Sequence, residues 1–484
     1  MARSAPESGA SASWRASKAV ILLQMDNVRG LKPFFEPRSI AIIGLSRKTG
    51  AGAYNALENL TGYGYSGRVY PVNPNADEIM GVKSYASVNA IPDPVDLAVI
   101  STPRARVPAH VRECAACGIR CISIVTQGFN DAGDEEGQRL FGEIRQTAAS
   151  TGCRILGPNS FGSANVFYNF SSAFARISMQ PNPIGLISQT GGIFNGVSEF
   201  RFVGKGIDVG NICNVDFADC LEYFEHDPQV KVIALHIEGM PDARRFLHIA
   251  RRISPCKPIV ALKTGRSRQA VKAAQSHTGS LAGSNEVWEA ALRQAGVISA
   301  SSLEEMVDFT RAFCLLPPLS NPNICVATFS GGTAIMALDA MQGSDLLAAD
   351  PAPGAMEKIS SLAPSWLGVG NPVDYWPMVM GTESVSRSIK RIMEILLADE
   401  TFGGWMFIQI VPDSGVSAAT RDMLKDLASG HPGKPLACVL PGAYGSELIK
   451  ELQEDGGVLA FPTPERASRA LACLYRYHRY HSAP

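Results

Sequence analysis

The sequence has no long hydrophobic run and almost no net charge. Its longest aliphatic stretches, such as AVILL and LAVI, are far too short to span a bilayer. The 44 basic and 45 acidic residues leave a net charge of −1, which argues against a surface built for nucleic acid or acidic lipids. We therefore expect no nucleic-acid or membrane partner. With 46% hydrophobic and 18% charged residues, the composition is that of an ordinary, well-packed protein.

Motifs for metals, disulfides and nucleoside triphosphates are also scarce. The 11 cysteines are odd in number and lie mostly in apolar segments, as in a reduced cytoplasmic protein. Cys114 and Cys117 form a CxxC motif without a second pair at zinc-site spacing, so we interpret them as packing residues and expect no metal site. The sequence contains no GxxxxGK[ST] motif and hence no P-loop.

The N-terminal segment is rich in Ala, Ser and Arg but lacks the apolar core of a secretory signal. We expect residues 1–29 to be a disordered extension. Met25, just before the first ordered-looking stretch, is an alternative start, which would remove residues 1–24.

Short apolar runs alternate with helical stretches from Ser39 onward. SIAIIGL, VYPVNPN, DLAVIST, CISIVTQGF and CRILGPNS lie roughly 30 residues apart, a spacing typical of strands alternating with helices. The pattern restarts at IGLISQTGG and, after the Pro-rich linker LLPPLSNPN, at ICVATFSGG. We predict an α/β protein with three Rossmann-like or flavodoxin-like parallel-sheet domains in tandem, at residues 30–165, 166–316 and 317–484.

The first turn between a strand and a helix, AIIGLSRKTGAG, suits a phosphorylated ligand. It turns at Gly44 and adds the donors Ser46, Arg47 and Lys48 close to a helix start. Its glycines do not follow GxGxxG, and the next strand ends in Asn73 rather than in the acid that usually holds the ribose of NAD. A merely tight strand–helix connection is the alternative.

Two later turns, LISQTGG and TFSGGTA, also place hydroxyl groups and glycines at helix starts, where an anion is stabilised. The candidate phosphate-binding residues are Ser188, Gln189, Thr190, Gly191 and Gly192 in the first turn and Ser330, Gly331 and Gly332 in the second. Each turn by itself is equally compatible with an ordinary helix cap.

One histidine and one carboxylate suggest covalent chemistry. His277 lies in a bare loop, SHTGSLAGS, while Glu238 lies at the carboxyl end of the strand in VKVIALHIEGM. A carboxylate that accepts a hydrogen bond from one imidazole nitrogen leaves the other nitrogen free as a nucleophile. From the residues alone, a surface histidine and an ordinary strand-end acid stay open as alternatives.

Segments along the chain resemble, in the same order, those of the NDP-forming acyl-CoA synthetases, relatives of succinyl-CoA synthetase. They include FFEPRSIAIIGLSR, GRVYPVNPNADEIMGVKSY, RILGPNSFG, SHTGSLAGS and NPVDYW, between about Phe34 and Ala472. The resemblance implies a CoA-binding first domain and a ligase domain with His277 as the transiently phosphorylated residue and Glu238 as its stabilising acid. The implied CoA-binding residues are Gly44, Ser46, Arg47, Asn73, Ser101, Pro103, Asn159 and Ser160.

The same resemblance implies that the chain is an α subunit. The family needs an ATP-grasp unit, which the sequence does not contain, so ATP or ADP with Mg²⁺ would bind a separate β subunit in an α2β2 assembly or beside an α homodimer. The implied reaction interconverts a small carboxylic acid, CoA and ATP with acyl-CoA, ADP and phosphate, through an acyl phosphate and a phosphohistidine. Which acid is used, and whether the nucleotide is ATP or GTP, stays open.

Two other functions compete with this one. A CoA-binding regulatory or scaffold protein without phosphotransfer would need neither His277 nor Glu238. A nicotinamide-dependent dehydrogenase is disfavoured by the missing acid near Asn73. The family often has cysteine where this chain has Ser160, and we expect this difference to alter the polarity of the pocket without abolishing activity.

Overall fold

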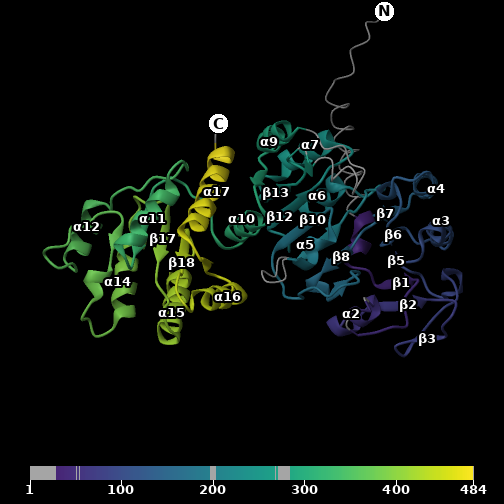
Figure 1. Ribbon diagram of the computed structural model, residues 1–484, viewed down its shortest axis with the longest axis horizontal. Coiled ribbons are helices and arrows are strands. Elements are labelled where there is room, and N and C mark those ends of the chain that lie inside the picture. The colour runs from purple at the N-terminus through teal and green to yellow at the C-terminus, as the bar shows by residue number, and fades with distance from the viewer. Residues whose placement is uncertain are drawn as a thin grey trace, which may run out of the picture. The chain divides into compact units, whose positions relative to one another are not determined.

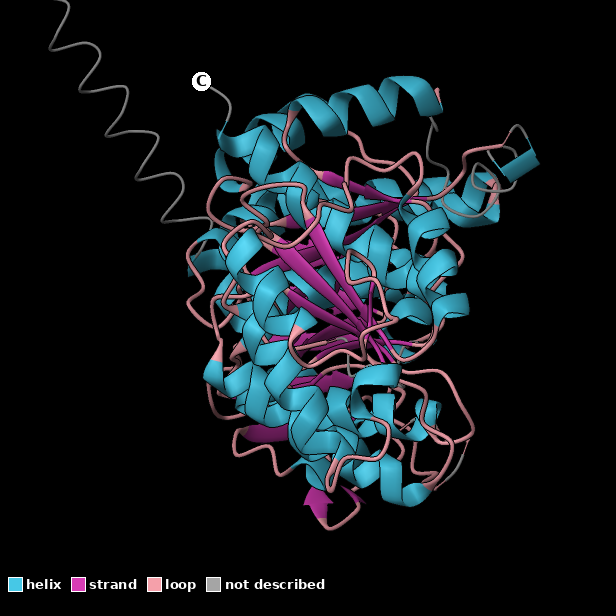
Figure 2. Ribbon diagram, turned by 90° about the vertical axis from the view of Figure 1, so that its left-hand side faces the viewer, coloured by secondary structure: helices cyan, strands magenta, loops and turns pink. Residues whose placement is uncertain are grey.

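The computed structural model describes residues 29–50, 52–53, 55–196, 203–267, 269–270 and 284–482. The chain divides into two compact units, one ending at Ser299 and the other beginning at Ala300. Within each unit, strands form the interior and helices surround them (Figures 1 and 2). The predicted extension up to residue 28 and the predicted phosphohistidine, His277, lie outside the described residues.

The first unit begins with a five-stranded parallel sheet in the order β2-β1-β5-β6-β7. Its strands are β1 (Ser39–Ile43), β2 (Arg68–Val72), β5 (Leu97–Ile100), β6 (Cys121–Ile124) and β7 (Arg154–Leu156), its helices are α2 (Ala56–Tyr63), α3 (Val107–Ala116) and α4 (Glu135–Thr151), and a hairpin joins β3 (Glu78–Ile79) to β4 (Val82–Lys83). Side chains alternate along a strand, so Ile40 and Ile42 pack on the side of α2, whereas Ala41 and Ile43 pack on the side of α3 and α4. Burial on both faces explains why β1 is apolar throughout.

A seven-stranded sheet in the order β14-β13-β12-β10-β11-β8-β9 completes the first unit. Its strands are β8 (Gly162–Asn165), β9 (Phe170–Ser171), β10 (Ile184–Ser188), β11 (Lys205–Asp208), β12 (Val232–Ile237), β13 (Ile259–Lys263) and β14 (Ile298–Ala300), and its helices are α5 (Gly191–Gly196), α6 (Phe217–Glu225), α7 (Ala243–Ile253) and α9 (Asn285–Gln294). β8 and β9 are antiparallel additions at the β11 edge. β8 therefore pairs with the second sheet, although the sequence-based boundary assigned its residues to the first domain.

One apolar core joins these two sheets. A helix at residues 29–35 contributes Phe34 and Phe35 to it, together with Ile40 of the first sheet and Phe224 of the second. The Phe35 ring stacks on Tyr223, with 4.4 Å between ring centroids. The two sheets therefore pack through a shared hydrophobic interior.

The second unit contains a five-stranded parallel sheet in the order β16-β15-β17-β18-β19. Its strands are β15 (Ile324–Thr328), β16 (Val373–Asp374), β17 (Gly404–Ile408), β18 (Leu436–Val439) and β19 (Leu459–Phe461), and its helices are α10 (Leu303–Leu315), α11 (Gly331–Met341), α12 (Pro353–Ser360), α13 (Trp376–Val379), α14 (Val385–Leu397), α15 (Ser414–Gly430), α16 (Gly445–Asp455) and α17 (Pro464–Ser482). Helix α10, which the sequence assigned to the preceding domain, is joined to α17 by an ion pair between Asp308 and Arg466 at 2.7 Å.

All three sheets have one strand order. Numbered along the chain, the five strands of each, β8 and β9 aside, lie in the spatial order 2-1-3-4-5, which is that of flavodoxin-like folds. The predicted fold class, α/β with three such domains in tandem, is confirmed. Among the described helices none is both long and apolar enough to cross a membrane.

Candidate functional site

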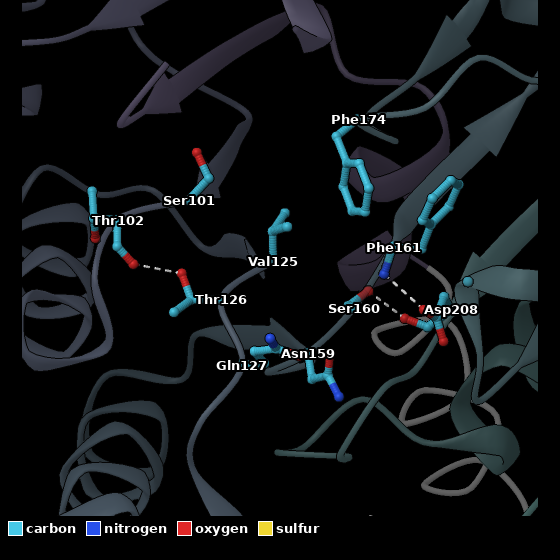
Figure 3. Close-up of a pocket in the computed structure, with 11 residues that line it drawn as sticks. Ser101, Thr102, Val125, Thr126, Gln127, Asn159, Ser160, Phe161, Phe174 and Asp208 are labelled. Carbon is cyan, nitrogen blue, oxygen red and sulfur yellow. Dashed lines mark hydrogen bonds between the residues drawn. The ribbon is translucent and has the colours of Figure 1, made fainter. Parts of the chain in front are cut away.

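A cavity of about 510 Å³ lies where the carboxyl ends of the two sheets of the first unit meet (Figure 3). Its lining residues are Ser101, Thr102, Val125, Thr126, Gln127, Asn159, Ser160, Phe161, Phe174, Gly191 and Asp208. Most of them follow β5, β6 and β7 of the first sheet, Phe174 follows β9 of the second sheet, and the other two begin α5 or end β11. In open α/β sheets such crevices at strand ends hold the ligand.

Three of the predicted CoA-binding residues, Ser101, Asn159 and Ser160, line this cavity. Asn159 has a left-handed backbone with φ of 57°, a conformation that asparagine tolerates better than most residues. The Ser160 hydroxyl donates to the backbone oxygen of Asp208 and accepts from the Gly162 N–H at 2.9 Å. Pro103 is not among the lining residues and precedes a short 3₁₀ helix at Arg104–Arg106.

The turn at Gly44 brings β1 and β5 together. Gly44 has φ of 88°, and a Cβ there would lie 2.8 Å from the Ser101 carbonyl oxygen, so only glycine allows this approach. The Asn73 side chain donates to the Leu45 carbonyl at 3.0 Å, and the Ser46 hydroxyl accepts from the Lys48 N–H at 3.1 Å. Asn73 and Ser46 thus shape the turn in this structure.

A second cavity, of about 340 Å³, lies beside this turn. It is lined by Gly50, Gly52, Asn55, Glu58, Asn59, Phe174, Ala175 and Arg176. Phe174 lines both cavities, which therefore adjoin. Arg47 is exposed and lines neither cavity. Adjoining cavities along the strand ends suit an extended ligand better than a compact one.

Two buried side-chain hydrogen-bond donors lie near these strand ends. The Thr102 hydroxyl and the side-chain nitrogen of Gln189 have no hydrogen-bond partner among the residues that the structure describes. A buried polar group left without a partner costs roughly 1–3 kcal/mol. Because Thr102 lines the larger cavity, a ligand rich in oxygen acceptors, as CoA is, fits this lining.

The predicted phosphate turn after β10 is hydrogen-bonded to the backbone of Glu238. The Gln189 side-chain oxygen accepts from the backbone N–H groups of Glu238, at 2.6 Å, and Gly239, at 2.9 Å. Ser188 accepts from the Thr190 N–H at 3.0 Å, and Gly191 lines the cavity. The structure therefore brings the first predicted phosphate turn to both Glu238 and the cavity, whereas Gly192 is not a lining residue.

Charged groups surround the end of β12. Lys263 donates to the Glu238 backbone oxygen at 3.0 Å, and burial lowers the Lys263 pKa against the opposing effect of the Glu238 charge. Burial, helped by Lys263, lowers the pKa of His236 to about 4. Burial raises the pKa of Asp208 to about 7, and the Glu238 charge adds to this rise. His277 lies outside the described residues, so its approach to Glu238 stays a prediction.

The second predicted phosphate turn lies in the other unit. Ser330 precedes α11, and the Ser330 N–H donates to the Thr328 hydroxyl at 3.2 Å. The Ser330 carbonyl accepts from the Thr333 hydroxyl at 2.8 Å. Gly331 and Gly332 are exposed at the helix start. Its use as an anion site stays a prediction.

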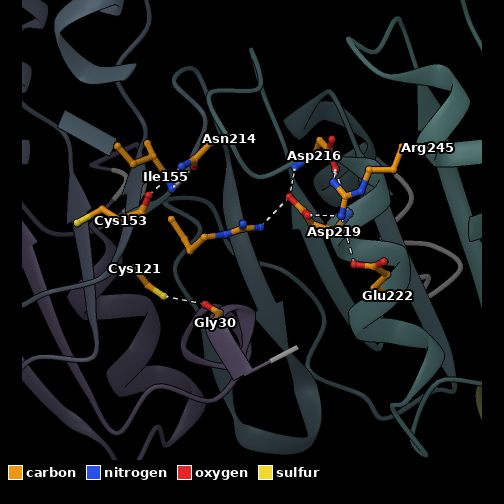
Figure 4. Close-up of polar contacts among 10 residues, drawn as sticks. Gly30, Cys121, Cys153, Ile155, Asn214, Asp216, Asp219, Glu222 and Arg245 are labelled. Carbon is orange, nitrogen blue, oxygen red and sulfur yellow. Dashed lines mark hydrogen bonds and ion pairs between the residues drawn. The ribbon is translucent and has the colours of Figure 1, made fainter. Parts of the chain in front are cut away.

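A polar network joins the two sheets of the first unit (Figure 4). Arg154 of β7 and Arg245 of α7 both pair with the Asp219 carboxylate, each at 2.7 Å. Arg245 also pairs with Asp216 at 3.5 Å and Glu222 at 3.2 Å. The buried carboxylate of Asp219 thus connects the first sheet to helices of the second.

Several lining residues carry no recognisable sequence signal. These residues are Thr102, Val125, Thr126, Gln127, Phe161, Phe174 and Asp208. The rule that ligands bind at the carboxyl ends of parallel strands could have indicated those that directly follow or end a strand, but not Phe174.

For a metal, the described residues contain no group of three His, Cys, Asp or Glu side chains placed to hold an ion.

Comparison with known proteins decides the family. A CoA binding domain matches residues 38–165, and a succinyl-CoA ligase like flavodoxin domain matches residues 181–313. The α subunit of acetate–CoA ligase [ADP-forming] II from Pyrococcus furiosus is 35% identical over 449 residues, which cover 91% of this chain and 96% of that subunit. The chain belongs to the α subunits of the ADP-forming acetate–CoA ligase family. The acid–thiol ligase class expected from the sequence is thereby confirmed.

Further relatives show how this α subunit compares with other ligases. A solved acetyl-coenzyme A synthetase 1 from Ca. Korarchaeum cryptofilum, in complex with phosphate and ADP, has a TM-score of 0.83 and 31% identity, covering 93% of this chain and 97% of that chain. The 4-hydroxybutyrate–CoA ligase [ADP-forming] of Nitrosopumilus maritimus is 30% identical over 92% of this chain, which covers only 64% of that ligase. These relatives favour a ligase over the CoA-binding regulatory or scaffold protein.

Proposed function

We propose that this α subunit makes acyl-CoA from a carboxylic acid, CoA and ATP, with His277 carrying the phosphoryl group. The observation that carries the proposal is that predicted residues for two ligands line one cavity. Ser101, Asn159 and Ser160, expected to contact CoA, line the same cavity as Gly191 of the turn expected to hold phosphate. An enzyme that joins CoA to an acyl phosphate needs these two binding regions next to each other.

The proposed reaction has three balanced steps. ATP transfers its γ-phosphoryl group to a nitrogen of His277 and leaves as ADP. The acid's carboxylate then attacks that phosphorus, which frees the imidazole and yields an acyl phosphate. Finally the CoA thiol attacks the acyl carbon, phosphate leaves with the electrons of the broken C–O bond, and the thiol proton ends on the released phosphate. Glu238 would hold the imidazole in the reactive tautomer.

The nucleotide and its Mg²⁺ would be held by a partner chain. Relatives of this chain are named as α subunits, and the sequence has no P-loop. We propose a separate β subunit with an ATP-grasp fold, assembled as α2β2 or around an α homodimer. A cytoplasmic location also stays a prediction.

Trapping of the phosphoenzyme tests this proposal directly. The chain is purified with its partner and incubated with γ-labelled ATP and magnesium. We expect a label that is stable in base and labile in acid, mapped to His277 by mass spectrometry. In the His277→Ala variant we expect neither label nor turnover but unchanged CoA affinity, because CoA would bind the other domain.

A matched histidine variant controls for unspecific effects. His226 is an exposed histidine that follows α6 in the same unit, so His226→Ala should label and turn over as the wild type does. A fully active His277→Ala protein, or a label on another residue, would show that the proposed phosphohistidine is wrong.

A further inference from the structure

Two phenylalanines form one wall of the larger cavity. The Phe161 and Phe174 rings both line it and meet edge to face, with 4.8 Å between their centroids. Figure 3 shows them side by side, while Thr126 and Gln127 lie on the other side of the cavity. Phe194 of α5 backs this wall, with its ring centroid 5.7 Å from that of Phe161. The two rings, with Ser160 and Asp208 beside Phe161, therefore form one side of the cavity, and Thr126 and Gln127 form the other.

Phe161 is fixed by a backbone hydrogen bond and by the packing of its ring. Its backbone N–H donates to the buried Asp208 carboxylate at 2.7 Å, and the residue is only 7% exposed. A Cβ added at Gly191 would lie 2.7 Å from a ring carbon, so the ring packs directly onto the first residue of α5. Since Gly191 belongs to the predicted phosphate turn, the aromatic wall adjoins the place where phosphate is expected.

We propose that Phe161 and Phe174 form the acyl pocket, and that the acid substrate carries an apolar group much larger than a methyl, such as an aromatic ring. This inference rests on the proposed function. In that reaction the acyl carbon lies between the CoA thiol and the phosphate. Phe161 follows Ser160 in the chain and packs onto Gly191, so the substituent would face the phenylalanine wall.

The size of the apolar surface decides between small and large acids. Phe161 is buried and Phe174 half-buried, so Phe174 contributes more of the open aromatic surface. A phenyl or branched alkyl group would contact more of this surface than the methyl of acetate does. In hydrophobic pockets, one added methylene changes kcat/KM by about 10-fold to 200-fold. The polar side, with Thr126 and Gln127, matches the amide groups of the CoA arm and offers no comparable contact to an apolar substituent.

Acid specificity of the enzyme, assembled with its partner, tests the inference. We would measure kcat/KM for acetate, 3-methylbutanoate and phenylacetate. At least one of the two large acids should exceed acetate by about 10-fold or more. Phe161→Ala should lower kcat/KM for the preferred large acid by about 10-fold while changing that for acetate less than about 3-fold, and Phe161→Leu should fall between.

The control is another phenylalanine of the same unit. Phe167 is 37% exposed and lines neither cavity, so Phe167→Leu should keep the wild-type preference. If Phe161→Ala is insoluble, Phe161→Leu and Phe174→Leu carry the test. An enzyme that uses acetate at least as well as both large acids, or a preference unchanged in the Phe161 and Phe174 variants, would overturn the inference.

Phosphoenzyme formation separates the two hypotheses. Labelling from ATP does not involve the acid, so it reports on His277 alone. A labelled enzyme that favours acetate contradicts the aromatic pocket and leaves the proposed function intact. An unlabelled enzyme contradicts the proposed function itself.

Discussion

Asp208 is the residue with the least ordinary environment around the cavity. Its side chain is buried, and its carboxylate accepts the N–H groups of Phe161, at 2.7 Å, and Gly210, at 3.2 Å. Burial raises its pKa to about 7, more than these two hydrogen bonds lower it. At neutral pH the carboxyl group behind the phenylalanine wall is therefore close to its titration midpoint.

The free energy of unfolding should change with pH as the Asp208 carboxyl titrates. Since the folded pKa of Asp208 exceeds the unfolded value, its contribution is complete below about pH 4 and is lost as pH rises towards 7. Asp208→Asn cannot titrate. The free energy of unfolding of the variant, minus that of the wild type, should therefore rise by about 2 kcal/mol between pH 5.5 and pH 8.

Urea denaturation at the two pH values measures this difference. The comparison does not depend on whether the variant is more or less stable overall, because only the change with pH matters. A difference that is the same at pH 5.5 and pH 8 would mean that the Asp208 carboxyl keeps an ordinary pKa.

At the scale of elements, β7 and α6 determine how the two sheets of the first unit meet. Asn214, between β11 and α6, accepts from the Ile155 N–H at 2.7 Å and donates to the Cys153 carbonyl at 2.8 Å. Arg154, which lies between Cys153 and Ile155 in the chain, forms an ion pair with Asp219 of α6 at 2.7 Å. The edge strand of the first sheet is thus fastened to the second sheet by backbone and side-chain contacts together.

Removal of Arg154 should loosen this connection. Arg154→Met keeps the aliphatic stem but leaves the 5% exposed Asp219 carboxylate with Arg245 as its remaining cation. Because Arg154 itself is 27% exposed, we expect a loss of about 2 kcal/mol rather than the larger value of a fully buried pair. Urea denaturation of the variant measures it.

An exposed ion pair of the same sheet provides the matched control. Arg68 and Asp93 pair at 3.3 Å with 58% and 43% of their side chains exposed. Arg68→Met should cost less than about 1 kcal/mol, because solvent screens such pairs. Equal losses in the two variants would show that the Arg154 contact carries no special weight.

At the scale of the whole molecule, one fold is used three times. Each sheet has the strand order 2-1-3-4-5, and the chemistry-bearing residues follow its strands. Two of these sheets share the cavity described above, whereas the third lies in the second unit. None of the three provides a P-loop, which fits the proposal that a partner chain holds the nucleotide.

The isolated chain should therefore bind CoA without turning over nucleotide. Titration calorimetry with CoA should give a saturable signal, and the same titration with ADP or NADH should give none. Turnover should begin only when the partner chain is added. Formation of ATP from acyl-CoA, ADP and phosphate by this chain alone would show that the nucleotide site is not on a partner.

The sequence by itself determined the fold class and the family. Strands of a parallel sheet are buried on both faces, so runs such as SIAII in β1 are continuously apolar and easily recognised. The turns at Gly44 and Gly191 were also indicated, because glycines and hydrogen-bond donors stand there between an apolar run and a helical stretch. Local sequence carries this information since each feature depends on a few consecutive residues.

Only the tertiary structure decided which side chains share the cavity and where two strands belong. β8 reads GSAN, which has no strand pattern, yet it pairs with β11 and covers what would be an open edge of the second sheet. Ser101, Val125, Gly191 and Asp208 come from separate segments of the two sheets and meet only when the sheets pack together. Contacts between distant segments depend on the packing of whole elements, and no local pattern records them.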